Sequence, residues 1–462
     1  MILRRISVTG LSLLFVSLTA TLLQAQNTTT TTTTSNVAGV EVDADGVLRM
    51  HMFVDRSGAL TRSSIEASLR SISADLARSS NLRKVSLNRL ETAVAARIAA
   101  GETPTEAMRY LAGLQRIQYV FVYPETGDIV VAGPAEAWAS DLSGRVRGIG
   151  TGAPVIELQD LIVALRAFPP AGKETPVIRC SIDPTKEGLA NMQQFLVRLG
   201  SRATPNKTRF IVDGLRKSLG LQNVTIGGVP ADTHFAKILV EADYRMKLIG
   251  IGLERTGVRM KSYVDLASPT SVARNAMQRW YFVPDYECVR VSEDELAMQL
   301  VGNSVKLVGA DEMVAADGTR VNAGLVDTAG KRFVQGFTDK YPELAKAVPV
   351  YAQLRNLIDM SVAAAYIQRQ DFYSQVGWSM ELFGNEDAFS VQTGKAPQRV
   401  ETAVSAVWRG NRLMTPIGGG VNIQPRLALN SSNLLQDEQG MVKKQRDDIK
   451  LDHLKADQWW WD

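Results

Sequence analysis

The chain has 462 residues, of which 45% are hydrophobic and 22% charged, and its formal net charge is +4. These fractions are ordinary for a globular protein, and the length is sufficient for two or three domains. Basic residues are spread among acidic ones without forming a stripe, so we expect no nucleic acid partner.

The first 25 residues predict a secretory signal peptide. Arg4 and Arg5 precede an apolar run over residues 6–23, and small residues lead to a cleavage site after Ala25. The alternative is a retained membrane anchor, but the run is short and diluted by serine and threonine, whereas a span needs about 20 apolar residues. We therefore expect an exported mature chain of net charge +2 in the periplasm, cell envelope or extracellular space. We expect no membrane span after cleavage.

A threonine-rich linker follows at residues 26–36, with no apolar face to bury. Alternating residues around Asp45 and Gly46 then predict a β-hairpin over residues 40–54. Apolar periodicity predicts helices at 62–78, 87–100, 105–114 and 158–168, and a second hairpin over 117–131. These elements make up an N-terminal α/β lobe, residues 37–170.

The segment 169–176 is rich in proline and predicts a boundary before a C-terminal α/β lobe, residues 171–428. In this lobe we expect strands at 177–182 and 224–226, helices at 184–199, 207–219, 232–254 and 351–370, and short strands between 400 and 424. We interpret Gly418, Gly419 and Gly420 as a bend. The predicted fold class is mixed α/β (α+β), with two lobes of helices and short mixed sheets.

Residues 429–462 carry mixed charges and few apolar side chains before Trp459, Trp460 and Trp461, which predicts a disordered tail. The three tryptophans would serve either as a docking peptide or as a terminus that packs back on its own domain.

Cys180 and Cys288 lie in apolar runs that read as strands. Export to an oxidising compartment permits a disulfide between them, and two buried thiols are the alternative.

The segment 232–254 places apolar residues on one helical face and two charged pairs at a spacing of four, Glu241 with Arg245 and Asp243 with Lys247. Because Val240, Tyr244 and Leu248 lie toward the other side, the helix is expected to be covered on both faces. The pairs would then be partly buried, as a structural network or as part of a site.

The segment 278–291 combines Trp280 and Tyr281 with Asp285 and Glu287. Exposed, Trp280, Tyr281 and Tyr286 would form a platform for a sugar or peptide. Tyr244 is a further candidate binding residue, and Asp243, Asp285 and Glu287 would be candidate catalytic carboxylates with Arg245. Buried, the aromatic residues would be core strands, which is the favoured interpretation.

Familiar catalytic signatures are missing from the sequence, and the three histidines are far apart, so we expect no metal site and no cofactor. The loop Gly148–Gly152 has backbone amides that could cradle an anion, but a flexible loop is the favoured interpretation.

Five stretches carry a resemblance to a known family: residues 242–247, 250–254, 279–284, 305–310 and 415–421. Together they resemble the bacterial exported proteins grouped as domain of unknown function 1598, over most of the mature chain. The resemblance implies export and brings no established activity and no catalytic residues.

Three hypotheses follow for the function. The leading one is a non-catalytic cell-envelope component that binds or assembles with another envelope protein or a glycan. The second is an envelope hydrolase or carbohydrate-active enzyme that uses carboxylates. The third is a small-ligand-binding protein with a site between the two lobes.

Overall fold

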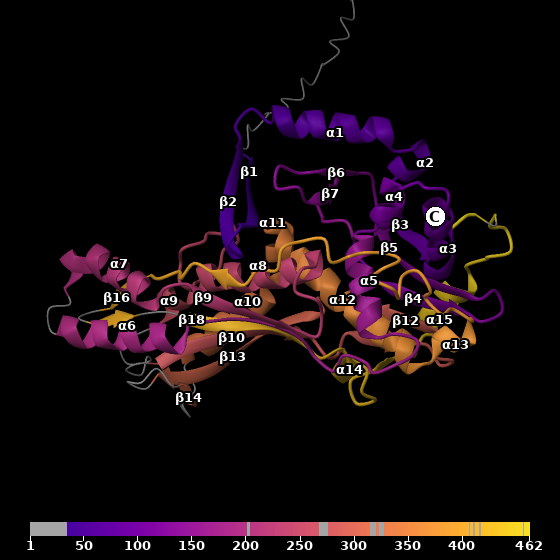
Figure 1. Ribbon diagram of the computed structural model, residues 1–462. Helices are drawn as coiled ribbons and strands as arrows, with labels where there is room; N and C mark the ends of the chain where they lie inside the picture. Colours follow the sequence, from indigo (N-terminus) through magenta and orange to yellow (C-terminus); the bar gives the residue numbers. More distant parts are fainter. Residues whose placement is uncertain are drawn as a thin grey trace, which may run out of the picture.

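The computed structural model describes residues 35–200, 204–267, 276–314, 320–322, 328–405, 407–409, 412–414, 417–455 and 457–462. Two sheets and the helices that cover them confirm the predicted mixed α/β class (Figure 1). The predicted signal peptide and all but the last two residues of the predicted linker lie outside the described residues.

The larger sheet has nine strands drawn from both predicted lobes. In spatial order they are β1 (Ser35–Val42), β2 (Val47–Asp55), β15 (Arg399–Val400), β9 (Gln222–Gly227), β8 (Ile178–Asp183), β18 (Ile417–Ile423), β10 (Ala276–Pro284), β13 (Val305–Val314) and β14 (Arg320–Asn322). The predicted first hairpin is confirmed, since β1 pairs antiparallel with β2. The β2–β15 and β10–β18 pairs are parallel and the others antiparallel.

The glycine triplet is not a bend, contrary to the sequence-based interpretation. It lies inside β18, where Gly419 pairs with Trp280 on one side and with Ile182 on the other. A Cβ atom on Gly419 would lie 2.2 Å from the carbonyl oxygen of Trp280, and one on Gly420 would lie 2.2 Å from that of Cys180. Glycine is needed here because the neighbouring backbones leave no room for a side chain.

The second sheet has seven strands and is covered on both faces. Their order is β19 (Leu435–Gln436), β11 (Val289–Val291), β12 (Ala297–Leu300), β4 (Tyr119–Tyr123), β5 (Asp128–Ala135), β3 (Ser80–Ser86) and β20 (Trp460–Trp461). Alternate side chains point to opposite faces of a strand. Val120 and Val122 accordingly join the main core, whereas Phe121 and Tyr123 join a separate cluster with Val442.

That separate cluster explains why the tail, predicted to be disordered, is ordered over residues 429–455 and 457–462. Helix α15 (Met441–Asp447) covers the second face of the sheet, and β20 pairs antiparallel with β3. The guanidinium of the fully buried Arg83 stacks over Trp460 and binds the Asp462 side chain through two hydrogen bonds of 2.8 Å. The tryptophans therefore pack back on their own domain.

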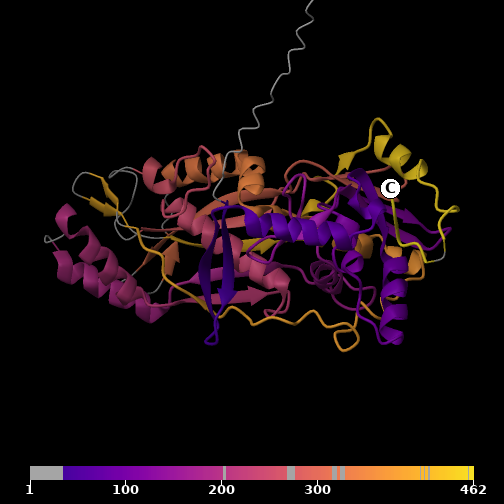
Figure 2. The same ribbon diagram turned by 90° about the horizontal axis from the view of Figure 1, so that it is seen from above.

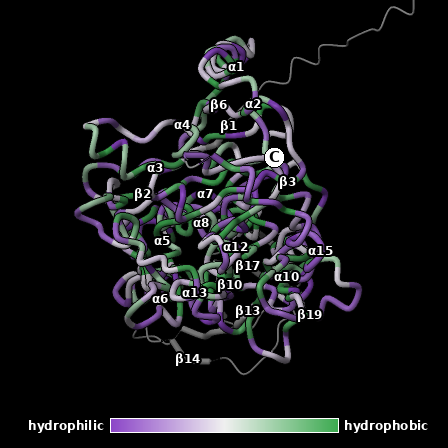
Figure 3. Tube along the Cα trace, turned by 90° about the vertical axis from the view of Figure 1, so that its right-hand side faces the viewer, coloured by the Kyte–Doolittle hydropathy of each residue, from purple (hydrophilic) through white to green (hydrophobic). Residues whose placement is uncertain are grey.

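The proline-rich boundary does not separate the two sheets. β1 and β2 come from before residue 170 and join the nine-stranded sheet, while β11 and β12 come from after it and join the seven-stranded one. One cluster of buried hydrophobic residues extends through both lobes. The chain before and after the boundary is thus interleaved in one core, which Figure 3 shows as hydrophobic segments gathered in the interior.

Three helices form the centre of the molecule. α8 (His234–Gly250) packs on β8 and β18, and α12 (Pro349–Arg369) packs against α8 and α5 (Leu158–Ala167). The expectation that the helix after residue 232 is covered on both faces is confirmed, because Glu241, Asp243 and Lys247 are all buried.

Several elements surround this centre. They are α1 (Ala59–Ser71), α2 (Ala74–Ala77), α3 (Leu87–Ala99), α4 (Glu106–Arg109), β6 (Trp138–Ser140), β7 (Val146–Gly148), α6 (Lys186–Leu199), α7 (Thr208–Leu219), α9 (Tyr263–Leu266), α10 (Thr328–Asp339), α11 (Tyr341–Ala347), α13 (Phe372–Gln375), β16 (Val407–Arg409), β17 (Arg412–Met414) and α14 (Pro425–Ala428). Seen from above, the molecule is elongated, with α6 and α7 at one end and the C-terminus toward the other (Figure 2). Among the described residues, no helix has the length and apolar character that crossing a membrane requires.

Candidate functional site

A polar cavity of about 220 Å³ lies where β1, the β6–β7 turn, the start of α5, the first half of α8 and the start of α12 meet. Its charged lining residues come from three places in the sequence: Arg145 from the turn, Glu157 from the residue before α5, and His234, Lys237 and Glu241 from α8. Segments from both sides of the proline-rich boundary therefore build its walls.

The β6–β7 turn fixes the position of Arg145. The Asp141 carboxylate accepts hydrogen bonds from the backbone amides of Ser143 (2.8 Å) and Arg145 (3.1 Å). Gly144 has a φ of 81°, a left-handed conformation that glycine adopts without strain. This local geometry directs the Arg145 side chain inward, where its Nε donates to Gln353 Oε1 at 2.8 Å.

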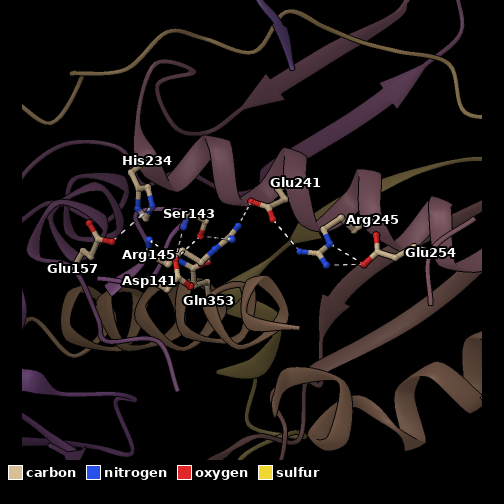
Figure 4. A network of polar contacts seen from close by, with 9 residues as sticks. All are labelled: Asp141, Ser143, Arg145, Glu157, His234, Glu241, Arg245, Glu254 and Gln353. Atoms are coloured by element: carbon tan, nitrogen blue, oxygen red, sulfur yellow. Dashed lines mark hydrogen bonds and ion pairs between the residues drawn. The ribbon is translucent and has the colours of Figure 1, made fainter. Parts of the chain in front are cut away.

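A chain of alternating charges extends from Arg145 along α8 (Figure 4). One oxygen of Glu241 contacts Arg145, and the other is 3.3 Å from Arg245, which in turn contacts Glu254 at 2.7 Å. Burial raises the pKa of Glu254, opposed by Arg245. Each charge is stabilised by its neighbours, because an unpaired buried charge is very costly.

His234 lies at the other end of the cavity. Its Nδ1 is 2.9 Å from Asp160 Oδ2, and its Nε2 is 3.8 Å from Glu157 Oε1. Burial lowers the pKa of His234, but the charges of Asp160 and Glu157 outweigh it and bring the pKa to about 9. The imidazole is therefore a cation at neutral pH.

Lys237 lies one helical turn after His234 and is half-buried. Its ammonium has no hydrogen-bond or ion-pair partner within the described residues, although it lines the cavity. Glu157 is held by His234 and by the Gln159 amide, which donates to it at 2.6 Å. Lys237 is thus a cation without a partner beside groups that already pair with one another.

The glycine-rich loop predicted to be flexible holds an anion from its own chain. The backbone amides of Gly150 and Thr151 donate to the Glu136 carboxylate at 3.1 and 2.9 Å. The Gln115 amide adds a third hydrogen bond of 2.6 Å. The loop therefore serves to satisfy a buried glutamate.

The residues singled out from the sequence do not share one cleft. Asp243 is fully buried on the side of α8 that faces the sheet, where Lys247 binds it at 3.0 Å and burial raises its pKa to about 6. Arg245 belongs to the charge chain on another side of the helix. Asp285 binds Lys306 at 2.6 Å at the end of β10, and Glu287 is exposed.

The aromatic residues follow the core interpretation. Trp280 is fully buried, with its ring centroid 4.4 Å from that of Phe333, and Tyr244 is buried on α8. Tyr281 is half-buried under the Arg279 guanidinium, 5.2 Å from the ring centroid.

The two cysteines are free thiols, and each is buried in a different sheet region, Cys180 in β8 and Cys288 beside β11. Burial raises the pKa of both thiols. Among the residues that the structure describes, no group of three or more histidine, cysteine, aspartate or glutamate side chains is arranged to hold a metal ion.

A second, more open depression of about 600 Å³ lies at the proline-rich boundary. Lys173, Glu174 and Arg426 line it, and Glu174 and Arg426 pair with each other. It lacks the buried charged side chains that give the first cavity a fixed polar geometry.

Sequence reasoning missed Arg145, Glu157, His234 and Lys237 as site residues. His234 and Lys237 are three residues apart at the start of a correctly predicted helix. This spacing was the one sequence feature that could have indicated a shared site. Arg145 and Glu157 come from a turn and a helix cap, where hydrophobic periodicity gives no information.

Comparison with known proteins adds one finding. No curated protein and no solved structure matches the chain. One segment of the chain, residues 180–263, matches a family model. It runs from β8 through α8 and contains His234, Lys237 and Glu241, whereas Arg145 and Glu157 lie outside it. Three of the five stretches that carry the resemblance described above also lie outside it. Residues 180–263 match the family described as "Protein of unknown function (DUF1598)", for which no activity is established.

Proposed function

We propose that this chain is an exported, non-catalytic protein of the cell envelope that binds a small ligand in the cavity lined by Arg145, His234 and Lys237. The ligand carries an anionic group, such as a carboxylate. The observation that carries the proposal is that Lys237 lines a polar cavity and has no hydrogen-bond or ion-pair partner among the described residues.

The surrounding network supports binding because it is already rigid. Glu241 is 2% exposed and engages two arginines, so these three side chains are held in place before any ligand arrives. A preorganised site loses little conformational entropy on binding. The Gln159 amide, which donates one N–H to Glu157, lines the same cavity, and its second N–H would orient a polar ligand.

The proposal also includes assembly at the envelope, which rests on the apolar leader. Cell fractionation and N-terminal sequencing of the native protein test this part. We expect a product that begins at Gln26 and is recovered outside the cytoplasm; an intact leader on a cytosolic product would contradict it.

Calorimetry and thermal shift of the processed chain test the binding site. The probes are the free amino acids, short dicarboxylates and inorganic phosphate, at low ionic strength. At least one probe should raise the melting temperature. Lys237→Gln should weaken its binding about tenfold, which corresponds to about 1.4 kcal/mol.

The matched control is Lys346→Gln, which removes an exposed lysine of α11. It should bind the probe as the wild type does. If no probe shifts the melting temperature, or if Lys237→Gln binds with unchanged affinity, the cavity is not the ligand site.

A further inference from the structure

The helical hairpin formed by α6 and α7 is a projecting unit with a small core of its own (Figures 1 and 2). Leu189, Met192 and Leu199 of α6 pack with Ile211, Leu215 and Leu219 of α7 and with Val404 from the segment after β15, in a cluster separate from the main hydrophobic core. Changes on the outer surface of this hairpin are therefore remote from the central fold.

Two large apolar side chains at the tip of the hairpin are left outside this core. Val197, in the last turn of α6, is 79% exposed, and Phe210, in the first turn of α7, is 61% exposed. The Phe210 ring lies 6.2 Å from that of Phe195, which is half-buried. Phe195 therefore supports an aromatic side chain that faces solvent.

Basic residues lie close to these two residues in the sequence. Arg198, Lys207 and Arg209 are exposed at the same tip, and Lys207 and Arg209 have no ion-pair partner among the residues that the structure describes. Further along α7, Arg216 pairs loosely with Asp213 at 3.8 Å. In a mature chain of nearly neutral charge, this hairpin is a local concentration of positive charge with apolar side chains in its midst.

We propose that the tip of this hairpin, defined by Val197, Arg198, Lys207, Arg209 and Phe210, binds the surface of a bilayer that contains anionic phospholipids. The two apolar side chains enter the boundary between headgroups and acyl chains, and the basic side chains pair with lipid phosphates. Burial of apolar surface and attraction to anionic lipids are the two contributions that hold peripheral proteins on membranes.

The shape of the tip favours a bilayer over an acidic protein partner. A stable protein interface buries roughly 1,200–2,000 Å² in total, over a surface shaped to its partner. The tip instead offers two isolated apolar side chains at the end of a narrow projection. A fluid headgroup layer accommodates such a projection without a complementary surface.

Sedimentation with large unilamellar vesicles tests the proposal with the processed chain. One vesicle preparation contains phosphatidylcholine alone, and the other contains phosphatidylcholine and phosphatidylglycerol in equal parts. The wild type should sediment with the anionic vesicles and be released by added salt, because screening weakens the attraction. It should remain in the supernatant with phosphatidylcholine alone.

Two variants test the two contributions separately. Phe210→Ser should weaken vesicle binding about tenfold, because the variant lacks the aromatic ring whose transfer from water into the bilayer favours binding. Arg209→Glu should weaken it by at least about fivefold, the effect of one basic residue near an anionic surface. An acidic residue in the first turn of α7 suits the helix dipole, so folding should be preserved, and circular dichroism checks this.

The matched controls are Met441→Ser and Lys444→Glu on α15, which alter an exposed apolar and an exposed basic side chain elsewhere. Both should bind as the wild type does. Equal binding to both vesicle types, or loss in the α15 variants with retention in the hairpin variants, would overturn the proposal. So would binding to soluble polyglutamate as tight as to anionic vesicles and unchanged in Phe210→Ser, since that outcome indicates an acidic polymer as partner.

Discussion

Replacement of Glu241 by glutamine tests how much the charge chain along α8 contributes to the stability of the fold. Glu241 is 2% exposed and its two oxygens engage two different arginines. Glutamine keeps the shape and one acceptor but turns an amide donor toward a guanidinium. Arg245 retains Glu254, and Arg145 retains Gln353 and Ser143 but loses the carboxylate of Glu241.

Loss of one partner from a buried ion pair costs about 3–5 kcal/mol, because the remaining buried charge loses its ionised partner. We therefore expect Glu241→Gln to lower the free energy of unfolding by that amount. Urea denaturation followed by tryptophan fluorescence and by circular dichroism gives the value, provided that the two transitions coincide.

Two further variants define the origin of the loss. Glu66→Gln on α1 breaks an exposed pair with Arg70, 3.7 Å apart, and should change stability by less than about 0.5 kcal/mol. The double variant Arg145→Gln/Glu241→Gln removes both charges of the pair, so its loss of stability should be smaller than the sum of the losses in the two single variants. A loss below about 1 kcal/mol for Glu241→Gln, or strict additivity in the double variant, would refute the reasoning.

Three other predictions concern the site and its supports. Because the pKa of His234 is about 9, its ion pair stabilises the fold fully below pH 6.5 and loses this effect as pH rises through 9. The difference in free energy of unfolding between the wild type and His234→Gln should therefore shrink over that window by up to about 3 kcal/mol. A difference that does not depend on pH would contradict this prediction. Gly420→Ala should destabilise by about 1–3 kcal/mol in denaturant titration, because its methyl group meets the carbonyl oxygen of Cys180, and a neutral effect would show that the strands can separate. Asp462→Ala should lower the free energy of unfolding by about 1.5–3 kcal/mol and speed limited proteolysis of the tail, because Arg83 loses a charged acceptor. An unchanged rate of cleavage would indicate that other contacts hold the tail.

Local patterns were sufficient for most elements of this fold. The hairpin over residues 40–54 and the helix after residue 232 were predicted because alternation and helical periodicity reflect burial directly. Glu241 and Arg245 were predicted as a partly buried pair for the same reason. The charge chain itself was not, because Arg145 is 96 residues from Glu241 in sequence and belongs to a turn.

The errors have a common physical origin in long-range packing. The glycine triplet was interpreted as a bend because glycine is common in turns, but in β18 it permits close approach of two neighbouring backbones. The tail was interpreted as disordered because its own apolar residues are sparse. Its order depends on the exposed second face of β4, which only the folded sheet presents.

The interleaving of the two sheets constrains the order in which the chain can fold. β2 needs β15 as its neighbour, more than 300 residues later, and β3 needs β20 at residues 460–461. Neither sheet can be completed while the polypeptide is still being synthesised, so β2 and β3 must wait with one edge unpaired. Such distant pairings slow folding and expose the nascent chain to aggregation. The topology therefore favours folding after synthesis of the chain is complete.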